Sequence, residues 1–159
     1  MDRYHATCQA WLKASGSVPD PFLAESVARC CVFGPGAVAD REAPVRLAGS
    51  ARAIDPEDRS GRARTTLGAA LYRAGRFDEA IKQLGPNAPG DGREGTPIDW
   101  AFLALAHARR GDRPEARRWL EKRSSRTPPT DETVDPFWNE LTIQLLHREC
   151  RALLENGPG

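Results

Sequence analysis

The 159-residue sequence lacks a long apolar run and lacks any marked excess of one charge. A helix that crosses a membrane needs about 20 predominantly apolar residues in a row, and no stretch approaches that length. The 23 Lys and Arg residues nearly balance the 22 Asp and Glu residues, which leaves a formal net charge of +1. Because this balance gives no overall field toward nucleic acid or an anionic membrane, we expect neither as a partner.

The cysteines lack the spacing of a metal or redox motif. Cys8, Cys30, Cys31 and Cys150 include no C-x-x-C pair, and the adjacent two on one helix would point in different directions. They make a poor disulfide framework, so the sequence favours free, mostly buried thiols in a reducing compartment. Residues 1–16 are too short and too polar for a secretory signal. We therefore expect a cytoplasmic protein.

Catalytic signatures are also missing. The sequence has no glycine-rich loop of kinase type, no HRD-like triplet and no DFG. The stretches "FGPGAV" and "GSARAI" contain glycine but lack the strand-turn-helix context of a phosphate loop. Nothing links a thiol, a histidine and an orienting group into one pocket, as nucleophilic catalysis requires. We expect no catalytic residues and no cofactor, and an enzyme would have to reveal itself through a reactive thiol.

Two histidine–cysteine pairs have a spacing that zinc sites use. His5 and Cys8 are three residues apart, as are His147 and Cys150. Residues at this spacing share one face of a helix, so each pair offers two ligands. The sequence gives no reason for the two helices to meet, and cysteine on a terminal helix is more often a small buried apolar residue. We expect no metal.

What the sequence does contain is a repeat. The segments "GRARTTLGAALYRAGRFDEAIKQLG" (61–85) and "PIDWAFLALAHARRGDRPEARRWLE" (97–121) align without a gap at an interval of 36 residues. Each copy has a glycine at the central break, Gly75 and Gly111, where a positive φ can end the first helix. Small residues at other matched positions let the two helices of a pair approach closely; they are Gly68, Ala80, Ala104 and Ala116.

The spacing of these residues resembles the tetratricopeptide repeat. The positions that match its template are Leu67, Gly68, Ala80 and Leu84 in the first copy and Trp100, Leu103, Ala104, Ala116 and Leu120 in the second. The copies depart from it in two ways. His107 stands where the template has tyrosine, and the interval exceeds the usual 34 residues because of the proline- and glycine-rich stretch 85–97.

The rest of the chain completes an all-α fold. We predict a right-handed superhelical array of antiparallel helix pairs, a tetratricopeptide-like α-solenoid that forms one domain over residues 1–159 and ends in a C-terminal capping helix. Its parts are an N-terminal helix (1–19), a degenerate repeat (20–56), the two repeats (61–85 and 97–121) and the capping helix (135–156). Asp135 and Pro136 suit the start of the last helix.

The resemblance extends to a particular group of repeats. "PGAVADREAPVRLAGSARAIDPEDRSGRARTTLGAALYRAGRFDEAIKQL", "DWAFLALAHARRGDRPEARRWLEK" and the final "FWNELTIQLLHRECRALL" resemble the C-terminal tetratricopeptide segments of large bacterial serine/threonine protein kinases, which often carry WD-type repeats. The resemblance implies a binding module within a kinase-associated protein. No kinase role is implied for any residue, because the catalytic motifs are absent.

The register of that family places a binding surface on the concave face of the array. Its residues would be Arg62, Thr65, Ala69, Tyr72, Arg73, Ile98, Ala101, Leu105 and Arg109. Tyr72 would anchor a partner peptide, while Arg73 and Arg109 would orient an acidic group. The asparagine–lysine set with which some of these domains clamp a C-terminal carboxylate is not found at these positions.

Two other non-catalytic functions remain open. The array could act as a spacer in a larger assembly without a ligand of its own. The apolar stripe of the last helix could pair two copies of the chain into a homodimer. The basic stretch 109–126 is interrupted by Glu115 and Glu121, so a solvated helix face explains it better than a nucleic-acid surface. Our principal expectation is a non-catalytic module that binds another protein or peptide.

Overall fold

A computed structural model describes residues 2–15, 20–54, 61–85, 95–124 and 136–156. These residues fold into α-helices, and no strand occurs among them, so the predicted all-α class is confirmed. The helices are α1 (Asp2–Ser15), α2 (Pro21–Val32), α3 (Glu42–Ile54), α4 (Arg62–Arg73), α5 (Phe77–Leu84), α6 (Pro97–Arg109), α7 (Arg113–Ser124) and α8 (Pro136–Asn156).

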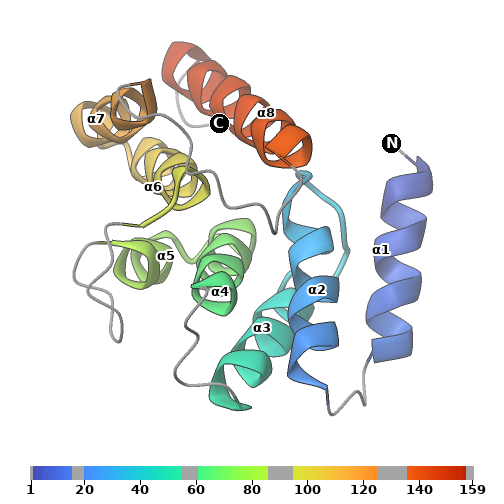
Figure 1. Cartoon of the computed structure of the whole chain (residues 1–159). Coiled ribbons are helices and arrows are strands. Elements are labelled where there is room, and N and C mark those ends of the chain that lie inside the picture. Colours follow the sequence, from blue (N-terminus) through green and yellow to red (C-terminus); the bar gives the residue numbers. More distant parts are fainter. Residues whose placement is uncertain (1, 16–19, 55–60, 86–94, 125–135, 157–159) are drawn as a thin grey trace.

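The helices form an array of pairs. α2 packs with α3, α4 with α5 and α6 with α7, and each pair contacts the next through α3 with α4 and α5 with α6. Figure 1 shows the pairs following one another across the molecule, with α1 beside α2 at one end. After the last pair in the sequence, α8 packs against α6. The chain is therefore an α-solenoid of helix pairs, preceded in the sequence by α1 and followed by α8.

The turns within the pairs follow from the two glycines that the repeat singled out. Gly75 has φ of +84° and Gly111 has φ of +82°, a backbone conformation that other residues rarely adopt. The amide of the residue after each glycine donates back to a carbonyl of the preceding helix, Arg76 to Leu71 and Asp112 to His107. Both turns thus reverse the chain while satisfying the helix ends.

The small residues of the repeat allow the helices to pack closely. A Cβ built on Gly68 would lie 2.3 Å from Cγ of Leu84, so α4 can approach α5 only because glycine stands there. Ala80, Ala104 and Ala116 are fully buried. The prediction that small residues at these positions let the helices of a pair approach closely is therefore confirmed.

α6 lies at the centre of the core. Its largest buried side chains are Trp100, Phe102, Leu103 and Leu105, and the same apolar cluster includes Ile143, Leu146 and Cys150 of α8. A second, smaller cluster joins α1 to α2 and to the turn after it, through Cys8, Cys31, Ala37 and Val38. The four cysteines are free, as expected.

A buried polar network fixes the start of α6 against α4. Thr96 and Asp99 form a reciprocal capping box, and the carboxylate of Asp99 also lies 2.7 Å from the Thr65 hydroxyl and 3.2 Å from Nη2 of Arg64. Burial raises the pKa of Asp99, and its hydrogen bonds with Thr65 and Thr96 and the charge of Arg64 oppose that effect. This network sets the position of one repeat relative to the next.

Candidate partner-binding site

Five of the nine residues expected on an open concave face are buried. They are Ala69, Tyr72, Ile98, Ala101 and Leu105, each exposed by no more than 9%. The expectation that they line a groove is wrong, because α8 packs along α6 and its Ile143 and Leu146 join the same apolar cluster. A side chain inside this cluster supports the fold and offers no surface to a partner.

Two further residues of that set are engaged within the array. Arg62 donates to the carboxylate of Glu25 at 3.0 Å and lies over the ring of Phe22, 5.3 Å from its centroid. The hydroxyl of Thr65 lies 2.7 Å from Asp99. Arg62 and Thr65 therefore connect helices, and the structure gives no separate site around them.

Arg73 is a connecting residue as well. Its guanidinium donates to the carbonyls of Val32 and Phe33 at 2.8 and 3.1 Å, where α2 ends. It also binds both carboxylate oxygens of Glu149 on α8, at 2.6 and 2.9 Å. One side chain thus joins α2, α4 and α8, and it is only 12% exposed. The expectation that Arg73 waits for a partner's acidic group is wrong, because a carboxylate of the same chain already occupies it.

Tyr72 completes the same contact. Its hydroxyl donates to Oε1 of Glu149 at 3.1 Å, and its ring packs against the rings of Phe77 and Phe102, each 5.7 Å away between centroids. Burial, followed by the negative charge of Glu149, raises the pKa of Tyr72 above its ordinary value. The hydroxyl therefore stays protonated and acts as a donor, and Tyr72 is an interior residue instead of an anchor for a partner.

An open hollow lies at one end of the helix pairs. It has a volume of about 240 Å³ and is bounded by the turn between α2 and α3, the ends of α4 and α6, and Glu149 of α8. Its lining residues are Cys31, Gly34, Pro35, Gly36, Ala37, Val38, Arg41, Pro44, Tyr72, Arg73, Gly75, Phe77, Arg109 and Glu149. We call this hollow the end cavity.

Arg41 and Arg109 are the exposed charged residues of the end cavity. The repeat register identified Arg109, which stands in the last turn of α6. It could not identify Arg41 or Glu149, because the first lies in a turn outside the repeat and the second resembles any charged residue of a long helix. Only the folded chain brings Glu149 to Arg73, 76 residues away in the sequence.

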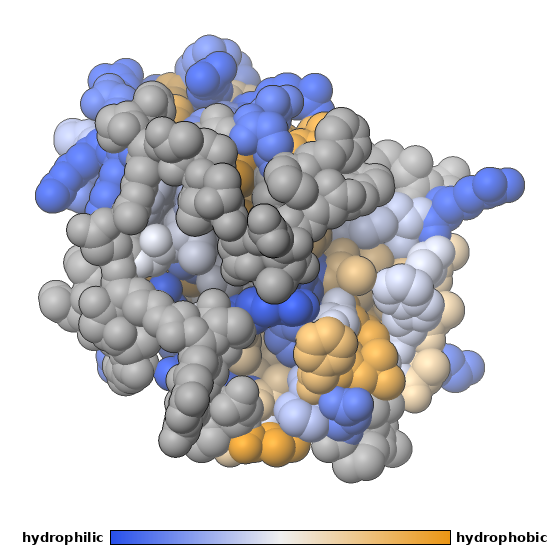
Figure 2. Space-filling view, in the orientation of Figure 1, coloured by the Kyte–Doolittle hydropathy of each residue, from blue (hydrophilic) through white to orange (hydrophobic). Residues whose placement is uncertain are grey.

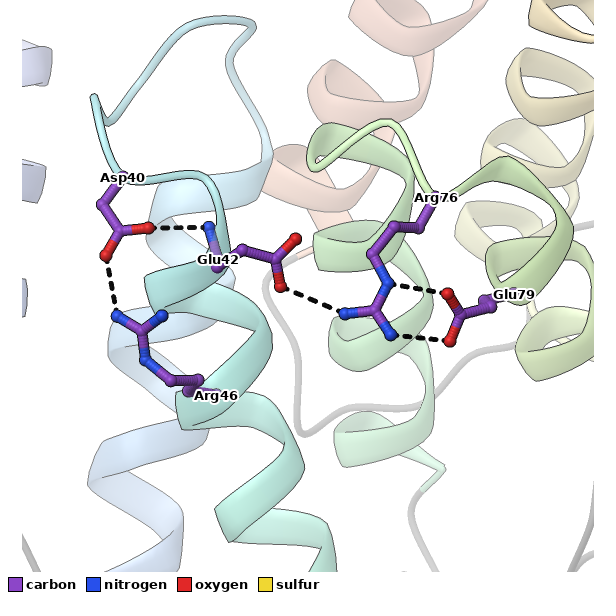
Figure 3. Close-up of polar contacts among 5 residues, drawn as sticks. All are labelled: Asp40, Glu42, Arg46, Arg76 and Glu79. Carbon is purple, nitrogen blue, oxygen red and sulfur yellow. Dashed lines mark hydrogen bonds and ion pairs between the residues drawn. The ribbon is translucent and has the colours of Figure 1, made fainter.

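Beside the end cavity, an edge of the array carries paired charges. Arg76 binds both oxygens of Glu79 and also reaches Glu42 at 3.1 Å, and Asp40 binds Arg46 at 2.7 Å (Figure 3). The hydrogen bond with Arg76 holds the pKa of Glu79 below its ordinary value. Three carboxylates face two arginines here, so these five groups carry a formal net charge of −1.

An exposed apolar patch lies on a different part of the surface. Figure 2 shows apolar side chains over part of the α2 region. Phe22 and Leu23, in the first turn of α2, are 66% and 46% exposed. They do not line the end cavity.

The histidine–cysteine pairs lie on the two terminal helices. His5 and Cys8 belong to α1, and His147 and Cys150 belong to α8. In the described ranges no group of three or more histidine, cysteine or acidic side chains is placed to hold a metal ion. None of the helices described there is long and apolar enough to cross a membrane.

A comparison with known families gave a match in the second and third helix pairs. A family model for the tetratricopeptide repeat matches residues 61–81 and residues 100–122. The first segment covers α4 and the start of α5, and the second covers most of α6 and α7. These two segments are similar to tetratricopeptide repeats, and they make up less than half of the chain. Neither the curated proteins nor the solved structures gave a match.

Proposed function

We propose that this chain is a non-catalytic protein-interaction module that takes its partner at the end cavity. Repeats of the tetratricopeptide family generally mediate contacts between proteins. The observation that supports the location is the end cavity itself. It is open and is lined by residues of six helices, α2 to α6 and α8, whereas α8 and the core cover the face that the family register assigns to a partner.

The setting of this interaction is part of the proposal. The resemblance of the chain to the terminal segments of bacterial kinases supports a role in a kinase-linked assembly. The four free cysteines fit a reducing compartment such as the cytoplasm. Neither point bears on which residues touch the partner.

The test blocks the mouth of the end cavity with a large side chain. Pro35 lines the end cavity and is exposed, so Pro35→Trp fills the entrance without removing a buried group. Pro114, exposed in the first turn of α7, provides the matched control Pro114→Trp. Both variants must first show the helix content and unfolding midpoint of the unchanged chain.

The measurement is capture of proteins from native lysate, with cross-linking and mass spectrometry to locate the contact. We expect a partner that the unchanged chain and Pro114→Trp retain and that Pro35→Trp loses. Cross-links should fall on residues around the end cavity. If Pro35→Trp retains the same proteins, or if the unchanged chain retains none, the proposal is wrong and a spacer role becomes the better explanation.

A second function has one specific observation in its favour. Leu141 and Leu145, one helical turn apart on α8, are 36% and 44% exposed. Two copies of the chain could pair through this stripe and bury both leucines. Analytical ultracentrifugation over a wide concentration range tests it: a dimer that Leu141→Gln/Leu145→Gln abolishes would support self-association, and a constant monomer mass would remove it.

A further inference from the structure

Positive charge is concentrated at the end cavity. Its lining includes three arginines, Arg41, Arg73 and Arg109, and one acidic residue, Glu149. The whole chain carries a formal net charge of only +1, so this lining holds a local excess that the rest of the molecule offsets elsewhere. A half-enclosed hollow with an excess of one charge attracts groups of the opposite charge.

One carboxylate already shows how this lining receives an acidic group. Glu149 accepts two hydrogen bonds from Arg73 and one from Tyr72. Arg73 is in turn held by two carbonyls at the end of α2, so its guanidinium cannot turn toward the opening. Arg73 and Glu149 therefore form a fixed back wall, and they neutralise each other.

Arg41 and Arg109 remain available in front of that wall. Both are exposed, and within the residues that the structure describes neither pairs with a carboxylate. The guanidinium of Arg109 carries five N–H donors, and at this exposed position they can bind an anion. A guanidinium presents its donors as a planar fork that matches a carboxylate.

The other lining residues determine which partner residues fit beside that acidic group. The turn after α2 contributes Gly34, Pro35, Ala37 and Val38, which are small or apolar. Ala37 and Val38 are buried and belong to the cluster beneath α1, so this floor is firmly supported. An acidic residue with small apolar neighbours fits such a surface better than a continuous run of charges does.

We propose that the end cavity binds an internal acidic side chain of a partner protein, held by Arg41 and Arg109, with Glu149 remaining on Arg73. The partner segment places small apolar residues against the turn after α2. This inference rests on the proposed function only in taking the ligand to be a protein segment. It adds that the partner is recognised through an acidic side chain, and it names the two arginines that bind this side chain.

The probe is a ten-residue peptide of alternating glutamate and alanine with blocked termini. Two matched peptides accompany it. The first has glutamine in place of every glutamate and blocked termini. The second has the same glutamine substitutions but a free C-terminal carboxylate. Binding to the full chain is followed by NMR, from backbone amide signals and arginine Nε–H signals. We expect saturable shifts at Ala37, Val38 and Arg109 with the glutamate peptide alone, weakening as salt is added.

The variant Arg41→Gln/Arg109→Gln should weaken this binding about tenfold or more, because charge-assisted hydrogen bonds to the carboxylate are lost. The control Lys82→Gln/Arg117→Gln removes the same charge from exposed sites on α5 and α7 and should change the affinity by less than about twofold. Glu149→Gln should retain or strengthen binding.

Four results would overturn the inference: no binding of the glutamate peptide, equal binding of the glutamine peptide, equal losses in the two double variants, or shifts spread over all exposed arginines. Binding of the free-terminus peptide alone would mean that a chain end is recognised in place of a side chain. If a partner is captured at the end cavity but the peptide experiments give any of these results, the proposed function is supported and the proposed recognition of an acidic side chain is wrong. Failure of the capture experiment alone removes the proposed function.

Discussion

At the scale of single residues, the contacts of Arg73 explain why the end of α4 requires an arginine. Its Nε and Nη2 satisfy carbonyls left open where α2 ends, while Nη1 and Nη2 bind the two oxygens of Glu149. Five donors in a rigid plane can serve both directions at once. The three donors of a lysine sit on a single nitrogen and cannot reach these acceptors together.

We expect Arg73→Lys to lower the free energy of unfolding by about 2 kcal/mol, since buried acceptors lose their donors. Glu149→Gln should cost about 1 kcal/mol, because an amide oxygen still accepts a hydrogen bond. Urea unfolding followed by circular dichroism measures both. The double variant should lose less than the sum, and Arg117→Lys on exposed α7 should be neutral. Additive losses would show that the two side chains do not act as a pair.

Two glycines on helices provide a matched pair for the packing argument. Gly68→Ala places a Cβ 2.3 Å from Leu84, which is buried and cannot easily move. We expect a loss of about 1–3 kcal/mol. At Gly49, within α3, an added Cβ would meet no atom within 4 Å, so Gly49→Ala should stabilise by about 0.5–1 kcal/mol through helix propensity. Midpoints of urea unfolding compare them, and a neutral Gly68→Ala would contradict the close contact.

At the scale of elements, α8 determines which surfaces of the repeats stay open. It covers α6 with an apolar stripe and reaches α4 through Glu149. A solenoid needs such cover at its last repeat, because the final helix pair otherwise exposes its apolar face. In this chain the same helix also closes the face that α4 and α6 would offer to a ligand.

Adjacent leucines on α8 test this placement. Leu146 is 1% exposed and lies in the core cluster, whereas Leu145 is 44% exposed. We expect Leu146→Ala to cost about 2–5 kcal/mol by leaving a cavity. Leu145→Ala should stay within about 0.5 kcal/mol, as surface substitutions usually do. Thermal and urea unfolding of both variants give the comparison. Equal losses would mean that α8 does not lie on α6 with the orientation described.

The helix pairs could be predicted from sequence because their signals are local. Gly75 and Gly111 mark the turns, and Gly68 with its counterpart Ala104 marks the close contacts within one repeat length. The position of α8 is not local, since its apolar stripe fits the end of the array or the concave face equally well. Because of this ambiguity the sequence predicted Ala101 and Leu105 as groove residues, whereas in the structure they are core residues. Arg41 lies outside the repeat, so no periodicity identifies it.

At the scale of the whole molecule, burial of ionisable groups makes stability depend on alkaline pH. Burial raises the pKa of the Cys150 thiol from 9.0 to about 11, and it raises the pKa of Tyr4 from 10.0 to about 12. The hydroxyl of Tyr4 donates to the carbonyl of Cys30 and accepts from the Gly34 amide, and Cys150, on α8, packs in the core cluster. The packing of both terminal helices, α1 and α8, therefore depends on pH in the same range.

The sign of this dependence follows from where the protons are lost first. Between pH 9 and 11 an unfolded Cys150 ionises while the folded thiol stays neutral, so the unfolded state releases protons and is favoured as pH rises. We expect the free energy of unfolding to be constant with respect to this group below about pH 9 and to fall through pH 11. Tyr4 should add a second decline between pH 10 and 12. Urea unfolding in a phosphine reductant gives the curves.

Other groups titrate in this range too, so the informative quantity is the difference between the unchanged chain and a variant. Cys150→Ala leaves a small cavity that lowers stability by the same amount at every pH. It also removes the thiol, so this position no longer titrates. Its loss relative to the unchanged chain should therefore shrink from pH 9 to 11. Tyr4→Phe should behave likewise one pH unit higher. If either difference stays constant with pH, that group is not protected by burial, and the packing of α8 or of α1 assigned to it is wrong.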